Sequence, residues 1–211
     1  MSYQVQVLHE GYSRLIEDVF EANCTCTLIT GPNNIIVDTM TPWDGNYILK
    51  KLEETGLTPD KINFVISTHG HSDHVGNNNL FLSARHIVGR CISYRNTYFD
   101  EPFSRGDEYV VDDDLRVLAT PGHTLACVSV IVRTADGVVA IAGDLFEKYE
   151  DVYNEYVWLG AGSENPDLQR QSRARVIQLA DYIIPGHGPR FKVTKEMKDT
   201  FKHIPNLPNT P

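Results

Sequence analysis

The sequence predicts one α/β (or α+β) domain, rich in strands, whose polar loops gather at the strand ends. Three observations lead to this prediction. Five short β-branched runs each end in a loop that holds an aspartate or a histidine. Two segments with helical spacing and helix start or stop signals lie between the runs, and no repeat or low-complexity tract divides the chain. Folds of this class place their chemistry in the loops at strand ends.

The strand predictions rest on runs rich in β-branched and apolar residues, each bounded by turn residues. The runs cover residues 34–37, 64–67, 117–119, 138–142 and 182–184. Directly or shortly after them come, in the same order, Asp38, His69, His123, Asp144 and His187. Two further runs near the N-terminus, residues 4–8 and 24–30, are predicted to pair with each other. Each of the five loops therefore supplies one potential ligand.

Two helices are predicted between the strands. The first follows Thr41-Pro42, a capping residue before a proline that suits the first helical turn, and Gly56 supplies its stop. Its apolar positions recur at helical spacing and are Trp43, Tyr47, Ile48 and Leu52. The second runs from about residue 165 to about residue 180 and is expected to bury Leu168, Val176 and Leu179.

Length and composition indicate a single core. With 211 residues, 41% of them hydrophobic, the chain falls in the size range of one large domain. We expect residues 1–203 to form the domain and residues 204–211, with three prolines, to be an irregular tail. No run of about 18 apolar residues exists, and the first ten residues lack a secretory signal pattern. The expectation is a soluble cytoplasmic or nuclear protein, or both, that is not secreted and binds no membrane.

The four cysteines, Cys24, Cys26, Cys91 and Cys127, have uneven spacing and do not suggest a disulfide framework. Cys24 and Cys26 lie two apart in a predicted strand, so we expect both to face the core; a soft-metal or redox pair is the alternative. Cys127 follows His123 by four residues. It is expected to be a small buried residue, with a place in the wall of the site as the alternative.

The net charge of −9 argues against a broad nucleic-acid-binding face, which needs basic residues to neutralise phosphates. The charge is uneven, because residues 170–202 carry eight basic and three acidic side chains. Arg170, Arg173 and Arg175 form a cluster in the second predicted helix. We expect these three side chains to face solvent, and contact with a nucleic-acid backbone is the alternative.

The strongest chemical signal is the segment Thr68-His69-Gly70-His71-Ser72-Asp73-His74, which follows a predicted buried strand. In an extended segment residues two apart point the same way, so His69 and His71 can bind one ion. Asp73 and His74 then face a second position, as the chain turns into a helix expected to end near Phe81. Imidazole and carboxylate ligands suit Zn²⁺, and Mn²⁺ or Fe would accept them as well.

Three further candidates stand beside glycine, which lets the backbone turn tightly toward an ion. The units are Pro121-Gly122-His123-Thr124, Ala142-Gly143-Asp144 and Pro185-Gly186-His187-Gly188. A single Gly-His pair is weak evidence for a metal site. Three such units, in this order after the His-x-His-x-Asp-His motif, are strong evidence for one.

These motifs resemble those of the metallo-β-lactamase superfamily, over residues 28–190. The resemblance implies an αββα sandwich of two packed sheets flanked by helices, with two metals in a groove along one edge. The implied ligands are His69, His71 and His123 for the first metal, Asp73, His74 and His187 for the second, and Asp144 as a bridge. True β-lactamases of the superfamily mostly have cysteine where Asp144 stands, so penicillin hydrolysis is not expected.

A narrower group of the superfamily resembles this chain in four segments. They are Thr-His-Gly-His-Ser-Asp-His-Val-Gly-Asn, Ala-Thr-Pro-Gly-His-Thr, Ala-Gly-Asp-Leu-Phe-Glu and Ile-Pro-Gly-His-Gly-Pro-Arg-Phe-Lys-Val. This resemblance implies a homodimeric endoribonuclease that acts on histone pre-messenger RNA in nucleus and cytoplasm. Only 42 residues separate Asp144 from His187, which excludes the large inserted domain of other RNA-processing relatives. We expect a weakly bound RNA substrate and a homodimer, with Ile204 and Leu207 as candidate contacts.

The expected mechanism is metal-assisted hydrolysis. Two Zn²⁺ ions stabilise both the entering and the leaving oxygen, which suits phosphodiesters and thioesters. Asp73 is predicted to orient the attacking water and to relay its proton. Asp38 is predicted to orient a ligand histidine or a loop, and closing a turn is the alternative role. Two other functions stay open: a glyoxalase II-like hydrolase of small thioesters or esters, and a non-catalytic metal-binding module.

Overall fold

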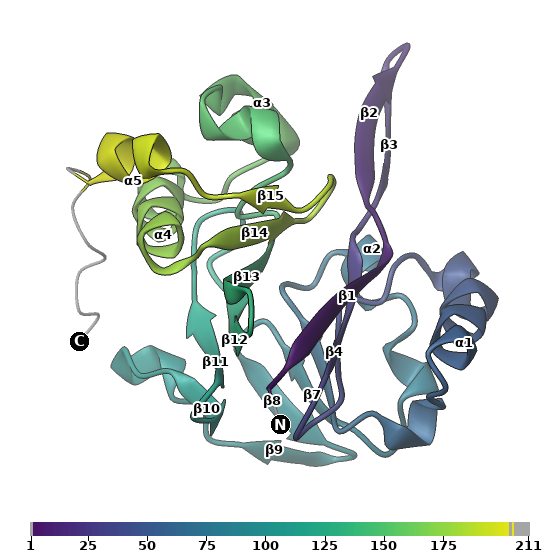
Figure 1. Ribbon diagram of the computed structural model, residues 1–211. Coiled ribbons are helices and arrows are strands. Elements are labelled where there is room, and N and C mark those ends of the chain that lie inside the picture. The colour runs from purple at the N-terminus through teal and green to yellow at the C-terminus, as the bar shows by residue number, and fades with distance from the viewer. Residues whose placement is uncertain (1, 203, 205–211) are drawn as a thin grey trace.

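The computed structural model, which describes residues 2–202 and 204, contains two large β-sheets packed face to face (Figure 1). The first sheet has seven strands in the order β1-β4-β5-β6-β7-β8-β9. These strands are β1 (Gln4–His9), β4 (Cys26–Thr30), β5 (Ile35–Val37), β6 (Phe64–Ser67), β7 (Arg85–Val88), β8 (Cys91–Tyr94) and β9 (Thr97–Phe99). The predicted pairing of the two N-terminal runs is confirmed, because β1 and β4 are antiparallel neighbours.

The second sheet has six strands in sequential order. They are β10 (Tyr109–Asp112), β11 (Leu115–Ala119), β12 (Val128–Thr134), β13 (Gly137–Gly143), β14 (Tyr182–Pro185) and β15 (Phe191–Lys192). The α-helices are α1 (Gly45–Glu54), α2 (Ser72–Val75), α3 (Glu155–Ala161), α4 (Pro166–Leu179) and α5 (Lys195–Phe201). Short 3-10 turns span Pro42–Asp44, Pro59–Lys61, Asn78–Leu80, Phe103–Arg105 and Tyr149–Val152.

Side chains that alternate along the strands build the layers. In β13, Val139 and Ile141 join the core between the two sheets, whereas Ala140 and Ala142 join the cluster that includes Val176 of α4. The first sheet behaves in the same way. Its outward residues, among them Leu28 and Ile36, pack with Ile48 and Leu52 of α1. The predicted αββα sandwich and its α/β class are therefore confirmed.

Parallel strand pairs bring the polar loops to one end of the sandwich. In the first sheet β5 and β6 are parallel neighbours, and in the second sheet β13 and β14 are parallel neighbours. The carboxyl ends of two parallel strands meet at the same sheet edge. Asp38 and His69 therefore leave the first sheet together, and Asp144 and His187 leave the second sheet together.

The second predicted helix is confirmed as α4, and Asn165 caps it by accepting the Leu168 N–H over 3.0 Å. Its predicted buried face is wrong in part, because Leu168 and Leu179 are only partly buried. The buried face instead contains the polar residues Gln169, Ser172 and Arg173. They bond to carbonyls of Asp144, Pro121 and Leu145 in the loops beneath α4. Loop carbonyls, which have no sequence signature, therefore decide which face of α4 is buried.

Two other helix predictions need correction. Trp43, predicted on the apolar face of the first helix, is 87% exposed, because it lies in the 3-10 turn that precedes α1. The helix predicted to reach Phe81 ends already at Val75. Asn77 explains this early end, since its side chain donates to the Thr39 and Thr41 carbonyls, both over 2.7 Å. These bonds tie the chain after α2 to the loop after β5.

The hairpin of β2 (Tyr12–Ile16) and β3 (Val19–Asn23) was not predicted from the sequence. It forms a separate two-stranded sheet and extends away from the two large sheets (Figure 1). Most of its side chains are exposed, Phe20 by 62% and Leu15 by 60%. Without a buried face, the hairpin lacks the alternation of apolar and polar residues that reveals a strand.

The cysteine expectations are confirmed for Cys24, Cys26 and Cys127, which are buried, and all four cysteines are free. Burial raises the pKa of these three thiols, which favours neutral side chains in the core. Within the described residues, no helix has the length and apolar character needed to cross a membrane. Apart from Ile204, the predicted tail lies outside the described residues, and so does the candidate contact Leu207.

Candidate metal centre

The segment that follows β6 carries four of the predicted ligands in one tight turn. The chain is extended at His71, with φ −67° and ψ 150°, and then turns into α2. His69 and His74 are completely buried, whereas His71 is exposed and Asp73 is half-buried. One short loop therefore presents four donor side chains at different depths.

The other three predicted ligands, His123, Asp144 and His187, arrive from loops that follow β11, β13 and β14. Glycine is needed where these loops pack together. A Cβ atom on Gly186 would overlap a carboxylate oxygen of Asp144, and one on Gly122, at φ +154°, would overlap the backbone of α4. These two glycines allow an approach that any larger residue would prevent.

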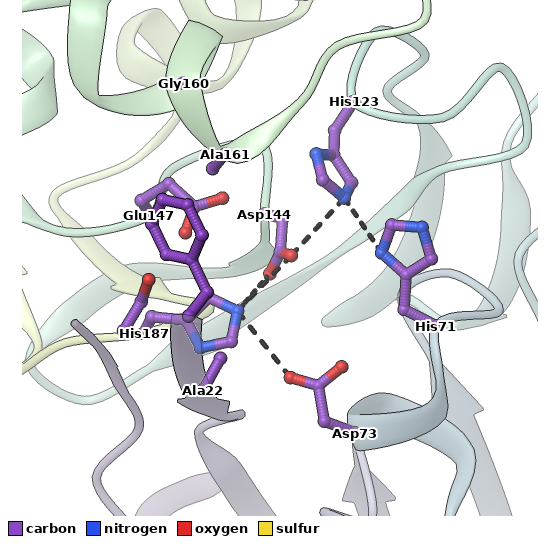
Figure 2. Close-up of a pocket in the computed structure, with 11 residues that line it drawn as sticks. Ala22, His71, Asp73, His123, Asp144, Glu147, Gly160, Ala161 and His187 are labelled. Carbon is purple, nitrogen blue, oxygen red and sulfur yellow. Dashed lines mark hydrogen bonds and ion pairs between the residues drawn. The ribbon is translucent and has the colours of Figure 1, made fainter. Parts of the chain in front are cut away.

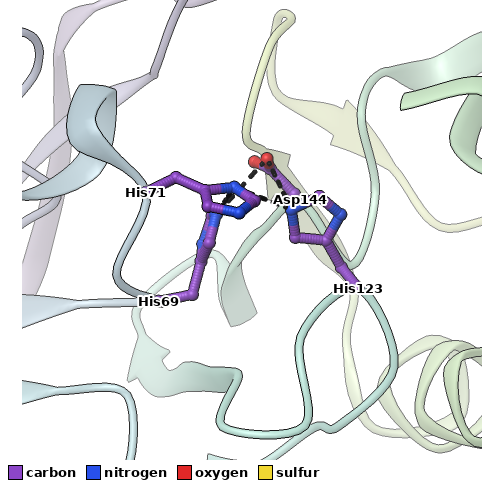
Figure 3. Close-up of side chains that lie close together, drawn as sticks. All are labelled: His69, His71, His123 and Asp144. Atoms are coloured by element: carbon purple, nitrogen blue, oxygen red, sulfur yellow. Dashed lines mark hydrogen bonds and ion pairs between the residues drawn. The ribbon is translucent and has the colours of Figure 1, made fainter. Parts of the chain in front are cut away.

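One group of donors consists of His69, His71, His123 and Asp144 (Figure 3). His71 Nδ1 lies 2.9 Å from His69 Nε2 and 3.1 Å from His123 Nε2. Asp144 Oδ2 lies 3.5 Å from His69 Nε2 and 3.4 Å from His123 Nε2. The structure thus brings together the ligands implied for the first metal and the bridging aspartate.

A second group consists of Asp73, His74 and His187, and it adjoins the first group through Asp144. Figure 2 shows Asp73 and His187 of this group beside Asp144. The Nε2 atoms of His74 and His187 lie 3.1 Å and 3.3 Å from Asp144 Oδ1. Both Nε2 atoms also lie 3.8 Å from Asp73 Oδ2. Asp144 therefore faces the first group with Oδ2 and the second group mainly with Oδ1.

The donor atoms fit metal ions better than they fit one another. Two nitrogens bound to one tetrahedral Zn²⁺ lie roughly 3.3 Å apart, because a Zn–N bond is about 2.0–2.1 Å long. The imidazole nitrogens of the first group have similar separations of 2.9 Å and 3.1 Å. Among the described residues, buried His74 Nε2 and Asp144 Oδ1 make no hydrogen bond, although they lie 3.1 Å apart. A shared cation satisfies such atoms, so the cluster is compatible with a binuclear metal site.

Backbone carbonyls hold two of the imidazole rings in place. His123 Nδ1 lies 2.8 Å from the Gly162 carbonyl oxygen, and His187 Nδ1 lies 3.1 Å from the Asn23 carbonyl oxygen. A proton on Nδ1 leaves the Nε2 lone pair free for a metal. Sequence reasoning missed these partners, because a carbonyl acceptor requires no particular residue type.

Asp38, predicted to orient a ligand histidine or a loop, contacts both. Its Oδ2 lies 2.9 Å from His74 Nδ1, and its Oδ1 accepts the Thr68 backbone N–H over 2.7 Å. The residue has a φ of +57°, a left-handed conformation in which aspartate is several times more frequent than most residues. Asp38 thus ties the end of β5 to the loop after β6 and directs His74 Nε2 toward Asp144.

Burial and close neighbours shift the protonation of the cluster. Burial lowers the pKa of His69 and His123, which favours the neutral imidazole that binds metals. Burial by itself would also lower the pKa of His187, but Asp144 outweighs it and raises that pKa to about 9. Burial would raise the pKa of Asp144, yet the histidines, His74 foremost, hold it well below its usual range. Asp144 is therefore a carboxylate in the metal-free protein.

The donors open into a cavity of about 220 Å³ (Figure 2). The predicted ligands that line it are His71, Asp73, His123, Asp144 and His187. Its walls come from two elements that the sequence did not predict, the β2–β3 hairpin and α3. The hairpin contributes Ser13, Phe20 and Ala22, and α3 contributes Gly160 and Ala161.

Glu147 is a residue of this cavity that sequence reasoning missed. It is 3% exposed and supplies a carboxylate oxygen within 4.8 Å of donor atoms of Asp144 and His187. Burial, together with the charge of Asp144, raises its pKa to about 8. The available signal was its place at the end of the segment Ala-Gly-Asp-Leu-Phe-Glu, three residues after Asp144.

The arginine cluster on α4 is not a free cationic face. Arg173, expected to face solvent, is 2% exposed and forms a buried ion pair with Asp151 over 2.8 Å, so that expectation is wrong. Arg170 and Arg175 have acidic partners at the surface. These are Glu155 and Asp167 for Arg170, and Glu108 for Arg175.

The fold and the His/Asp cluster define a metallo-hydrolase of one superfamily. Residues 19–187 match the Metallo-beta-lactamase superfamily, and the chain therefore belongs to it. The protein named Metallo-beta-lactamase domain-containing protein 1 from Xenopus laevis is 44% identical over 197 residues, which cover 92% of this chain and 83% of that protein. The human protein of the same name is 42% identical over 166 residues, or 77% of this chain, and the match spans 60% of the human protein.

More distant similarities include lactone hydrolases. An N-acyl homoserine lactonase from Bacillus sp is 30% identical over 131 residues, which cover 56% of this chain and 52% of that protein. A solved N-acyl homoserine lactone hydrolase, with the product N-hexanoyl-L-homoserine bound at its catalytic metal center, has a TM-score of 0.63 and 21% identity. That alignment covers 89% of this chain and 94% of the other chain, and it shows a shared fold.

Proposed function

We propose that this chain is a two-metal hydrolase that cleaves phosphodiester bonds in RNA, of the histone pre-messenger RNA type. The observation that carries the two-metal part is the position of Asp144. Its two carboxylate oxygens face separate groups of buried imidazole nitrogens at 3.1–3.5 Å. One carboxylate between two such groups is the arrangement of a bridging ligand.

The residues of the proposed site have distinct roles. His69, His71 and His123 would hold one ion, Asp73, His74 and His187 the other, and Asp144 would touch both. Two divalent cations, Zn²⁺ in the first instance, would neutralise charge on the scissile group and on the leaving oxygen. Asp73 combines contact with the histidines and access to the cavity, because its side chain is 18% exposed against 6% for Asp144. Asp73 would therefore orient the attacking water and accept its proton.

An RNA substrate is supported by the resemblance of the four motif segments to endoribonucleases of the superfamily. The 44% identity over 92% of the chain to the Xenopus relative strengthens that resemblance. The net charge of −9 and the paired arginines of α4 leave few groups for phosphate contacts. RNA binding should accordingly be weak and should depend on salt with a shallow slope.

A second candidate function is the hydrolysis of small esters, thioesters or lactones. It corresponds to the glyoxalase II-like alternative that the sequence left open. The 30% identity to the Bacillus lactonase favours it. The cavity walls favour it as well, because Phe20 and Ala22 place apolar surface beside the proposed metals.

Side-by-side turnover distinguishes the two candidates. The zinc-loaded protein is incubated with end-labelled single-stranded RNA, with a glutathione thioester and with N-hexanoyl homoserine lactone. We expect RNA cleavage to dominate and to disappear in Asp73→Asn, while the exposed Asp136→Asn serves as the matched control. Cleavage that persists in Asp73→Asn reveals a contaminating nuclease, and dominant ester or lactone turnover assigns the second candidate instead.

Metal content tests the binuclear site without any substrate. We expect two zinc ions per chain in the protein as isolated or after zinc supplementation. Elemental analysis that finds one ion or fewer per chain would contradict the proposal.

We also propose that the chain forms a homodimer, as the narrower resemblance implies. Light scattering should then report twice the 23.8 kDa of one chain at micromolar concentration. A species of 23.8 kDa would show that the chain is a monomer under these conditions.

A further inference from the structure

Glu147 is a buried carboxylate beside the metal pocket that the predicted ligand set does not include. It follows β13 in the turn that begins with Asp144, and Figure 2 shows it among the residues that line the cavity. The residue is 3% exposed and lines the cavity. Charged side chains are almost never buried to this extent unless they have a partner.

No partner for the inner oxygen is present in the described part of the chain. Glu147 Oε1 is buried and has no hydrogen bond there. The buried arginine of this region, Arg173, is committed to other acceptors. It donates to the Leu145 carbonyl over 2.7 Å and to Asp151 Oδ1 over 2.8 Å. Glu147 Oε1 is therefore a buried polar atom whose partner the arginine does not supply.

The backbone holds Glu147 in this position from two sides. Its N–H donates to Asp151 Oδ2 over 2.6 Å, and its carbonyl accepts the His187 N–H over 2.8 Å. The second bond links the turn after Asp144 directly to the loop that carries His187. A carboxylate oxygen of Glu147, a carboxylate oxygen of Asp144 and a ring nitrogen of His187 lie within 4.8 Å of one another.

We propose that Glu147 is a further ligand of the second metal, on the side of Asp144 and His187. The inference rests on the metal-binding part of the proposed function and is independent of the substrate. It gives the buried Oε1 atom its missing partner. It also makes the two metal positions chemically different.

The difference lies in the balance of nitrogen and oxygen donors. The first position has three imidazoles and the bridging Asp144, whereas the second has two imidazoles and, with Glu147, three carboxylates. Carboxylate oxygens suit harder cations such as Mn²⁺, and imidazole suits Zn²⁺. The second position should therefore accept Mn²⁺ more readily than the first.

The test compares metal binding by Glu147→Gln and by the control Glu150→Gln, which removes the same charge from an exposed side chain nearby. Metal-free proteins are titrated with Mn²⁺ and with Zn²⁺ against a competing chelator, and the ions per chain are counted. We expect Glu147→Gln to lose at least about tenfold in affinity for the second ion, more for Mn²⁺ than for Zn²⁺. Its first-ion affinity, and both affinities of Glu150→Gln, should match the wild type.

A spectrum of the wild-type protein provides a measurement that does not depend on the variant. Co²⁺ added to the second position should give the weak visible absorption of an ion with five or more ligands. The band should strengthen in Glu147→Gln if that variant keeps the wild-type fold by circular dichroism.

Two outcomes would overturn the proposal. If Glu147→Gln binds the second ion as tightly as the wild type, Glu147 is not a ligand. In that case Glu147 would be a protonated carboxyl that donates a hydrogen bond to Asp144. Glutamine can donate the same hydrogen bond, so the variant would then behave as the wild type does. If Co²⁺ in the wild type gives the strong visible absorption of a four-coordinate ion, Glu147 is likewise not a ligand. If the wild type binds fewer than two ions, the proposed function itself fails, which separates the two results.

Discussion

Two buried charged clusters adjoin each other, and they differ in how many of their polar atoms have partners within the chain. The Arg173 cluster is complete: its guanidinium donates to Asp151 and Leu145 and lies 4.2 Å from the centre of the Phe146 ring. The pocket cluster, which consists of the seven candidate ligands and Glu147, is incomplete, because three inner atoms have no hydrogen-bond partner among the described residues. These atoms are Asp144 Oδ1, Glu147 Oε1 and His74 Nε2.

This difference in hydrogen bonding indicates a structural role for the Arg173 cluster and a functional role for the pocket cluster. An ion pair whose bonds are all made within the chain needs no metal ion to satisfy it, although breaking it leaves an uncompensated buried charge. A cluster whose carboxylate oxygens and imidazole nitrogens lack partners is stabilised when a cation binds to them. Metal should therefore stabilise the pocket cluster and leave the Arg173 cluster unchanged.

The largest expected effect comes from Asp144→Asn, which removes the charge of the proposed bridging ligand from both proposed metal positions. Metal content should fall from two ions per chain to one or fewer, and turnover should fall on the order of 10³-fold, because metals supply several kcal/mol of barrier reduction. Elemental analysis and initial rates measure the two effects. Two ions per chain in this variant would show that the positions do not share Asp144.

Removing the buried ion pair of Arg173 and Asp151 should lower the stability of the protein equally with and without metal. Arg173→Met leaves Asp151 buried without its cation and should lower the free energy of unfolding by about 3–5 kcal/mol. Urea denaturation measures this loss, which should be equal in zinc and in EDTA. The exposed pair Arg14–Glu21 provides the control, since Glu21→Gln should cost less than about 1 kcal/mol. A loss seen only with zinc would tie Arg173 to the pocket.

A smaller effect is expected from Asp38→Asn. Asparagine tolerates the positive φ of this position and its one side-chain oxygen can accept the Thr68 N–H, so the change removes the charge and the acceptor beside His74 Nδ1. Affinity for the second metal should fall roughly 10–100-fold, the usual range for a partner of a ligand histidine. Chelator competition measures it. An equal loss at both positions would mean that Asp38 acts on the loop as a whole.

The smallest change is a pH dependence of the metal-free protein. The pKa of His187 is raised from 6.5 to about 9, and that of Glu147 from 4.5 to about 8. Folding therefore strengthens proton binding by both groups. Their stabilising contributions are complete below the unfolded pKa values and are lost as pH rises through the folded ones. The free energy of unfolding should decline between pH 6.5 and pH 9 without metal.

Metal ions should reverse this decline, because they bind the deprotonated donors. Urea denaturation at several pH values, with zinc and with EDTA, measures both curves. A metal-free protein whose stability rises over this range would contradict the assignment.

Sequence patterns were sufficient to predict helices and strands that bury one face against apolar neighbours. The run at residues 64–67 matches β6 to the residue, and the helix predicted at residues 165–180 is α4. The patterns failed where a segment has no apolar face buried against neighbours. Trp43 is exposed although its spacing is helical, and the hairpin that carries Phe20 has no buried face to reveal it.

The seven predicted ligands were identifiable because donor residues cluster at the ends of predicted strands and beside glycines. Their identity as ligands stays a prediction, while the structure shows that they lie together. Glu147 escaped notice although it ends the segment Ala-Gly-Asp-Leu-Phe-Glu, because a glutamate after two apolar residues does not by itself indicate a ligand. Its burial and its unpartnered oxygen become visible only when the turn after β13 is folded against the loop of His187.

The sequence by itself determined the strand order of the donors, the residue types that suit a metal, and the alternation that buries two sheets against each other. These properties depend on local spacing, which the linear chain contains. The tertiary structure decided which oxygen of Asp144 faces which histidine, which carbonyls hold the imidazoles, and that Arg173 is buried rather than solvent-exposed. Those features depend on distances between segments that are separated in the chain, and only the folding of loops, helices and sheets against one another fixes these distances.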